Sequence, residues 1–186
     1  MSTHKNLAAL VLALAFTAAP AFAENTGLGK PISEADIKNW DIAILPDGSN
    51  LPPGRGTPQE GAKVFAEKCA MCHGDQAKGG VMPFYPALVG GAPLTNGIET
   101  QKTIANYYAY ATTVFDYVRR AMPLTAPRSL TDSQYYAVTA YLLQREGIIA
   151  PGTVMDAKSL PAVQMPGRSH FVVDDRTGNP GGKSVR

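Results

Sequence analysis

Two cysteines separated by two residues and followed at once by a histidine constrain this chain more than any other feature. Cys69 and Cys72 are its two cysteines, and His73 follows the second. A dithiol redox pair would not require the histidine, and a zinc site would need two further ligands, whereas His170 lies far along the chain. Covalent attachment of one haem c explains all three residues, because two thioethers hold the ring edge and the histidine reaches the iron.

The first residues have the three-part layout of a secretory signal. A basic start at Lys5 precedes an apolar run over 7–19, and Ala21 and Ala23 supply the small residues of a cleavage site. We therefore expect cleavage after Ala23 and export to the periplasm. The alternative is a retained membrane anchor, although the run is short for a bilayer span. No second apolar stretch of spanning length follows, so we expect no membrane span after cleavage.

The charge balance argues against nucleic acid as a partner. The formal net charge of the full chain is +2, and removal of Lys5 lowers it further. Strong positive fields or basic runs would be expected for binding nucleic acid or an anionic membrane surface. The length after the signal suits one domain, and the 18 glycines and 15 prolines cluster outside the helical stretches. A small core with irregular segments around it is therefore predicted.

The first clear helix is predicted to begin after Thr57 and to run into the cysteine motif. Thr57 can cap the backbone, Pro58 suits the first helical position, and Glu60 completes a capping box. Helical periodicity returns over 101–121 as one helix or two short ones with a break near Tyr110.

The last helix has signals at both of its ends. Thr131 and Gln134 form a second capping box, and Leu130 and Tyr135 form a hydrophobic staple. Gly147 marks the end, after Arg145. The predicted organisation is a signal peptide over 1–23, an extended N-terminal arm over 24–56, a haem domain over 57–147 and a C-terminal tail over 148–186. Within the domain, residues 74–99 are predicted to form a loop around the haem.

The second axial ligand of the iron is expected to be a methionine. Met82 follows His73 closely, and to reach around the ring it would consume the whole loop. Met122 lies between two helices, where a loop can present its side chain to the other face of the ring. We favour Met122 and keep Met82 as the alternative ligand. If Met82 is not a ligand, we expect its flexible side chain to fill space in the core. A thioether ligand raises the reduction potential relative to a second histidine. Arg119, just before Met122, is a candidate partner for the haem propionates, as is Arg120.

The order of these elements resembles the class I cytochrome c fold over about 57–147, an all-α fold of three to five short helices around one covalent haem. In that family the first and last helices cross at a small residue and an aromatic, and Gly61, Phe65 and Tyr141 match those places. The family also uses a proline carbonyl in a Pro-x-Leu turn to orient the ligating histidine. Pro86-Ala87-Leu88 fits that turn, so the resemblance assigns this role to Pro86.

Segments outside the haem domain resemble the SoxD-type cytochrome subunits of periplasmic sulfite and sulfane dehydrogenases. The matching segments include Trp40-Asp41-Ile42, Pro46-Asp47-Gly48, residues 110–123 and the tail over 160–168. The resemblance implies an electron-transfer subunit that accepts electrons from a molybdopterin-dependent, sulfite-oxidase-like subunit. A soluble cytochrome c or an oxidase would then be the downstream acceptor. Because the chain has one motif, a mono-haem version is implied. With a histidine and a methionine on the iron, we expect no substrate chemistry at its own haem.

Two other functions stay open at this point. One is a free soluble electron carrier in the periplasm that serves another dehydrogenase or a terminal oxidase. The other is a haem enzyme with an open position on the iron. Trp40 in the N-terminal arm packs either on its own domain or on a partner.

Overall fold

A computed structural model describes residues 29–80, 85–94 and 100–172 of the chain. It divides into two units, residues 1–41 and residues 42–186, which are described separately. The signal peptide with its cleavage point, residues 24–28, Met82 and the end of the tail from 173 lie outside the described residues. The predictions for these segments therefore stay predictions.

The N-terminal unit contains a helix that the sequence analysis did not predict. Helix α2 spans Glu34–Trp40, inside the segment expected to be extended. Its capping box is the physical reason: the Ser33 side chain accepts a hydrogen bond from Asp36 N, and the Asp36 carboxylate accepts one from Ser33 N. The Trp40 side chain at its end is 82% exposed.

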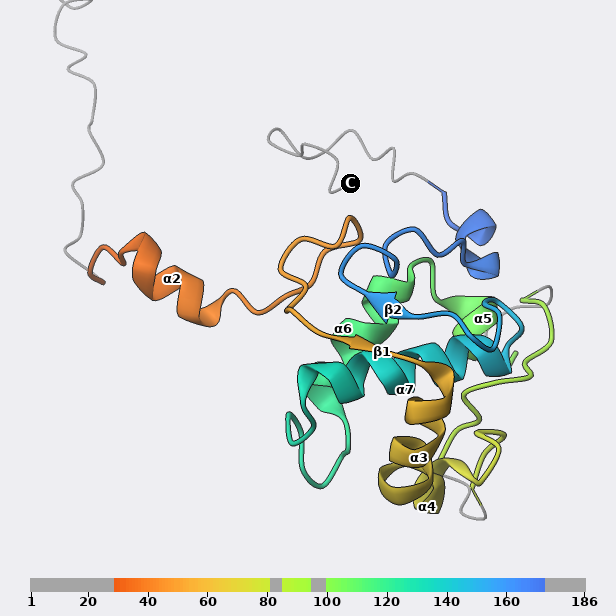
Figure 1. Cartoon of the computed structure of the whole chain (residues 1–186). Coiled ribbons are helices and arrows are strands. Elements are labelled where there is room, and N and C mark those ends of the chain that lie inside the picture. The colour runs from red at the N-terminus through yellow and green to blue at the C-terminus, as the bar shows by residue number, and fades with distance from the viewer. Residues whose placement is uncertain (1–28, 81–84, 95–99, 173–186) are drawn as a thin grey trace, which may run out of the picture. The chain divides into compact units, whose positions relative to one another are not determined.

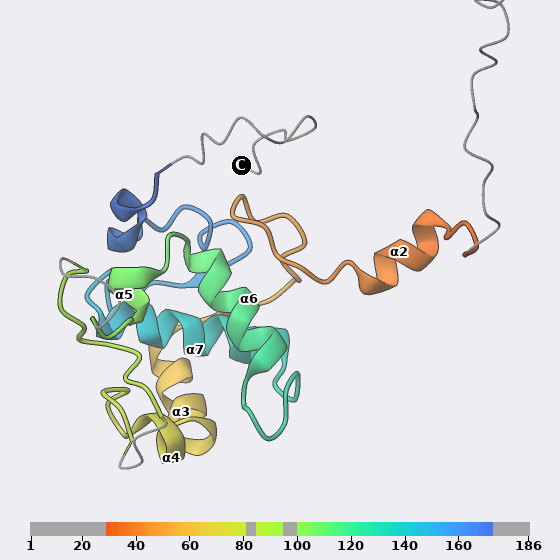
Figure 2. The same cartoon turned by 180° about the vertical axis from the view of Figure 1, so that it is seen from behind.

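The second unit is built from helices, as predicted. They are α3 (Pro58–Lys68), α4 (Ala70–His73), α5 (Ile104–Tyr107), α6 (Ala111–Ala121) and α7 (Asp132–Arg145), followed by the 3-10 helix η1 (Pro166–His170). Strands β1 (Arg55–Gly56) and β2 (Met155–Asp156) pair antiparallel, with Arg55 opposite Asp156. In Figure 1, β1 passes in front of α7 and α6 lies behind it, and Figure 2 shows the reverse order. The predicted all-α class is confirmed, since each strand has two residues.

The predicted helix boundaries are confirmed where local signals specify them. The Thr57 and Glu60 side chains form a capping box at the start of α3, and the Thr131 and Gln134 side chains form one at α7. The stretch over 101–121 is two helices with a break at residues 108–110, which is one of the two predicted forms. At the end of α7, Gly147 adopts a φ of +70° that favours glycine.

The crossing of α3 and α7 has the residues predicted for it. A Cβ atom at Gly61 would overlap the backbone of Ala137, so the absent side chain lets the two helices touch. The rings of Phe65 and Tyr141 make a tilted contact beside this point, with ring centroids 5.1 Å apart. This contact fixes the end of α3 that leads into the cysteine motif.

The inner parts of both flanking segments pack onto the helical core. On the N-terminal side, Ile44 is 6% exposed and Pro52 O accepts a hydrogen bond from the Tyr136 hydroxyl at 2.9 Å. On the C-terminal side, Leu160 is 0% exposed, and Met155 and Met165 are also buried. The core thus draws on residues on both sides of the predicted domain. In the described part of the chain, no helix is long and apolar enough to span a membrane.

Candidate cofactor site

The two cysteines and the histidine occupy a single helical turn. Cys69 caps the end of α3, and Cys72 and His73 lie in α4. A 2.9 Å hydrogen bond from His73 N to Cys69 O closes this turn. Both thiols are free and partly buried. Met71, between them, is 90% exposed and points away from the core. One short helical turn therefore carries both sulfur atoms and the imidazole, and this arrangement suits attachment of a haem through two thioethers.

The other two interpretations of the cysteine pair find less support in this geometry. The motif follows a helix, whereas a dithiol redox pair lies at a strand-to-helix junction. Burial raises the pKa of the Cys69 thiol to about 11, and the neighbouring Cys72 adds to the rise, so this thiol is protonated at neutral pH. Among the residues that the structure describes, no three His, Cys, Asp or Glu side chains gather as metal ligands.

The imidazole of His73 is oriented by a backbone carbonyl. Its Nδ1 atom lies 3.0 Å from Pro86 O. A carbonyl oxygen only accepts, so Nδ1 carries the proton and Nε2 keeps its lone pair for a metal. This is the contact that the resemblance assigned to Pro86, and its role toward a bound haem stays a proposal. The donor set of two thiols and an imidazole with a free Nε2 fits covalent haem.

Close backbone contacts hold the loop with Pro86 against the motif. Gly74 adopts a φ of +74°, and a Cβ atom there would overlap Gly79 O. A Cβ atom at Gly80 would overlap Cys72 O in the same way. Leu88 N donates to Ala77 O at 2.8 Å, which ties the far side of the loop. The two glycines thus let the chain return to the histidine.

Glu146, after α7, anchors this loop from the other side and is not among the predicted site residues. Its carboxylate accepts hydrogen bonds from Gly90 N, at 3.2 Å for Oε2 and 3.3 Å for Oε1. It also accepts one from Ala105 N at 3.4 Å, in the first turn of α5. No local signal identifies such a residue, because its partners come from two distant segments.

Met122 ends α6 and begins the exposed turn that leads to α7. Its N–H donates to Val118 O at 3.0 Å, and its carbonyl accepts from the Tyr135 hydroxyl at 3.3 Å. The side chain is partly buried. Figures 1 and 2 show α4 and the turn after α6 at the same lower end of this unit. Met82 lies outside the described residues, so the choice between the two methionines stays a prediction.

The two arginines before Met122 are paired with carboxylates of the protein. Arg119 Nε donates to Asp132 Oδ1 at 2.9 Å, and the Arg119 side chain is 17% exposed. Arg120 pairs with Asp116 one turn earlier. The guanidinium of Arg119 has further N–H groups, so its predicted contact with a haem propionate stays a proposal.

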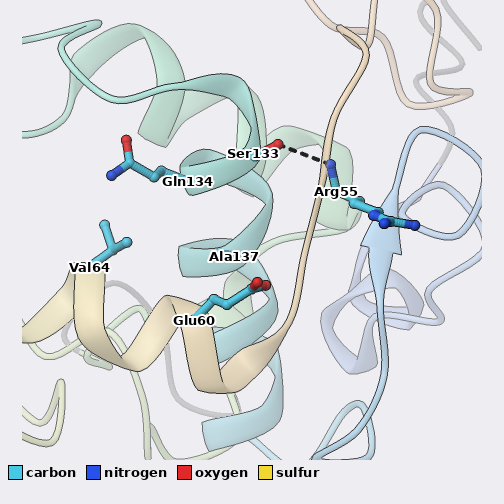
Figure 3. Close-up of a pocket in the computed structure, with 6 residues that line it drawn as sticks. All are labelled: Arg55, Glu60, Val64, Ser133, Gln134 and Ala137. Carbon is cyan, nitrogen blue, oxygen red and sulfur yellow. Dashed lines mark hydrogen bonds between the residues drawn. The ribbon is translucent and has the colours of Figure 1, made fainter.

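A separate pocket lies where β1 passes α3 and α7. Figure 3 shows that its lining comes from three elements: Arg55 from β1, Glu60 and Val64 from α3, and Ser133, Gln134 and Ala137 from α7. Ser133 Oγ accepts a hydrogen bond from Arg55 N at 3.4 Å. None of the residues of the cysteine motif lines this pocket, and we assign it no part in holding the cofactor.

Comparison with known proteins finds relatives of this chain in both sequence and structure. The family model described as Cytochrome c matches residues 58–146. The crystal structure of the sulfane dehydrogenase SoxCD from Paracoccus pantotrophus contains a chain that is 38% identical, with a TM-score of 0.70. The match covers 81% of this chain and 73% of that one. The predicted class I fold and the resemblance to the SoxD-type subunit are both confirmed.

A curated relative is the thiosulfate dehydrogenase of Stutzerimonas stutzeri (strain A1501). It is 29% identical over 121 residues, which are 58% of this chain. The chain spans 36% of the length of that relative. The likeness therefore concerns a part of the relative.

Proposed function

The chain belongs to the cytochrome c family, and we propose that it is a mono-haem electron-transfer subunit of a molybdenum-dependent sulfite or sulfane dehydrogenase. The observation that carries this proposal is the extent of the likeness to SoxCD. That match covers 81% of the chain, more than the residues 58–146 that define the haem domain. The shared flanking segments distinguish it from a general member of the family.

Each proposed site residue has a separate task. Cys69 and Cys72 would hold one haem c through thioethers, and His73 and Met122 would be its axial ligands. Pro86 would orient His73, and Arg119 would contact a propionate. A haem held in this way supplies one-electron oxidation and reduction, with a potential raised by the thioether sulfur. Because His73 and Met122 would both bind the iron, we propose that sulfur chemistry takes place on the partner subunit.

The proposed location is the periplasm, with the signal peptide removed after Ala23. The sequence supports this location, because it combines a secretory signal with a motif for covalent haem attachment. The downstream acceptor in this proposal is a soluble cytochrome c or an oxidase.

The ligand assignment is tested by substitution of individual methionines in the haem-loaded protein. Met122→Ala should abolish the weak red absorption band that ferric haem shows with a thioether ligand. Met165→Ala is the matched control, since Met165 is buried at 4% exposure in the C-terminal segment. Loss of the band in Met82→Ala in place of Met122→Ala would move the ligand to Met82. A high-spin wild-type spectrum that Met122→Ala leaves unchanged would point to an open haem position.

The partner is tested with protein purified from the native periplasm. We expect a complex with a larger molybdenum-containing subunit, and reduction of the haem by sulfite or a sulfane substrate only when that subunit is present. The proposal is abandoned if the haem protein elutes alone and a molybdenum-containing protein from the same periplasm does not reduce its haem.

A free periplasmic carrier is the second candidate function. It is favoured by the packing of Ile44 and Leu160 into the core, because flanking segments that cover their own helices do not need a partner surface. A carrier should exchange electrons with several partners at rates that fall steeply with salt, whereas a subunit should react with one partner inside a stable complex.

A further inference from the structure

We propose that the buried hydroxyl of Tyr135 is a positioning group for Met122, because it joins the two ends of the turn that begins with this methionine. The inference rests on the proposed role of Met122 as an axial ligand. Tyr135 touches no cofactor atom in this proposal and acts through the backbone of residues 122–130.

The hydroxyl bonds to both ends of the turn. It donates to Met122 O at 3.3 Å and accepts from Leu130 N at 3.3 Å. A phenolic hydroxyl has one proton to donate and lone pairs to accept, so it can make both bonds at once. The Tyr135 residue is 1% exposed, and its ring packs edge-on against Phe115 of α6, with centroids 6.4 Å apart. The oxygen therefore lies at a fixed point between α6 and α7.

The middle of the turn has little else to hold it. Residues 124–129 are all exposed, and the backbone hydrogen bond within the turn runs from Ala126 N to Pro123 O at 2.9 Å. The ion pair between Arg119 and Asp132, at 2.9 Å, ties the flanking helices together outside the turn. The Tyr135 hydroxyl, in contrast, bonds to Met122 itself, at the first residue of the turn.

Fixing the carbonyl of Met122 limits where its side chain can go. The carbonyl and the thioether belong to one residue, so the backbone orientation sets the range that the sulfur can reach. If Met122 is already held in place before its sulfur binds the iron, less conformational entropy is lost on binding. Without the hydroxyl, Met122 would leave its position more often, and an external ligand would compete with it more easily.

The neighbouring residue supplies a matched control. Tyr136 is also buried, at 0% exposure, and its ring packs on the same Phe115 with centroids 4.5 Å apart. Its hydroxyl donates to Pro52 O at 2.9 Å, in the N-terminal segment. Tyr135→Phe and Tyr136→Phe therefore remove the same atom from adjacent buried rings of one helix, and only the first removes a contact with Met122.

The experiment titrates imidazole into the ferric, haem-loaded full chain, with thermal unfolding measured alongside. Tyr135→Phe should lower the dissociation constant for imidazole about tenfold, which corresponds to about 1.4 kcal/mol. Tyr136→Phe should leave it at the wild-type value even if its melting temperature falls equally. Asp132→Asn weakens the ion pair with Arg119 that joins the two helices. It should also lower the dissociation constant for imidazole, by a smaller factor than Tyr135→Phe.

Met122→Ala separates failure of this inference from failure of the ligand assignment. If Met122→Ala leaves the spectrum and the imidazole affinity unchanged, Met122 is not the ligand and the assignment falls. If Met122→Ala changes both while Tyr135→Phe binds imidazole like the wild type, the ligand assignment stands and the positioning role is wrong. In the double variant, Tyr135→Phe should add nothing to Met122→Ala. An equal effect of Tyr136→Phe would reduce the role of Tyr135 to general stability.

Discussion

Gly61 of α3 and Ala137 of α7 meet without an intervening side chain. The contact is so close that a Cβ atom on Gly61 would overlap the carbonyl oxygen of Ala137. Phe65 and Tyr141 close the same crossing with a ring contact at 5.1 Å. Since α3 leads directly into Cys69, the position of this crossing sets where the cofactor motif lies on the domain.

Gly61→Ala should destabilise the protein although alanine is the better helix former. Overpacking of a tight contact costs about 1–3 kcal/mol, while the gain in helix propensity is about 1 kcal/mol. Urea unfolding should show a net loss in the free energy of unfolding. Gly152→Ala is the control, because nothing lies within 4 Å of a Cβ atom there. Equal stability of Gly61→Ala and the wild type would mean that α3 and α7 can separate at little cost.

Glu146→Ala should loosen the loop that carries Pro86. The substitution removes the acceptor of Gly90 N and Ala105 N, and hydrogen bonds to a charged group are worth about 1.5–3 kcal/mol. The amides of Gly90 and Ala105 should exchange with solvent faster than in the wild type, as measured by hydrogen exchange. Glu67→Ala, on the exposed face of α3, should change neither amide. Unchanged protection at Gly90 would show that contacts such as Leu88 N to Ala77 O hold the loop alone.

Leu160→Ala should cost about 2–5 kcal/mol of unfolding free energy, the range for removing a buried leucine side chain. Leu160 is 0% exposed although it lies beyond the predicted end of the haem domain. Leu124→Ala makes the same chemical change at a residue that is 68% exposed and should have little effect. The measurement is thermal or urea unfolding of both variants. A neutral Leu160→Ala would mean that the C-terminal segment folds separately from the helices.

Stability should fall in acid partly through Glu60. Hydrogen bonds from the Thr57 backbone and side chain hold the pKa of this carboxyl below its ordinary value of 4.5. A carboxyl with a lowered pKa in the folded state stabilises the protein above its unfolded pKa. It loses that contribution as the pH falls through the folded pKa. Glu60→Gln should therefore be slightly less stable than the wild type at neutral pH and equal to it in strong acid.

The effect at Glu60 is small because the side chain is exposed. Urea unfolding of both proteins across this pH range measures it, with Glu67→Gln as the control on the same helix. A stability difference that persists unchanged in strong acid would show that the charge of Glu60 is not its source.

Local patterns predicted the helix ends that the structure shows, and they are also the source of the proposed cofactor motif. Thr57 with Glu60 and Thr131 with Gln134 act over three residues, so their capping boxes can be recognised without knowing the fold. The same kind of signal at Ser33 and Asp36 produced the unpredicted helix α2, in a segment interpreted as extended from its prolines and glycines.

The sequence by itself indicated the helical class and the chemistry proposed for the site, and its resemblance to the class I fold indicated where α3 and α7 cross. Cys69, Cys72 and His73 are close together in the chain, so a short pattern predicts their joint role, and one helical turn brings them together. The tertiary structure alone decided what holds the site in place. Tyr135 on Met122, Glu146 on Gly90 and Leu160 in the core are contacts between residues apart in sequence, and which of them form depends on how the whole chain packs.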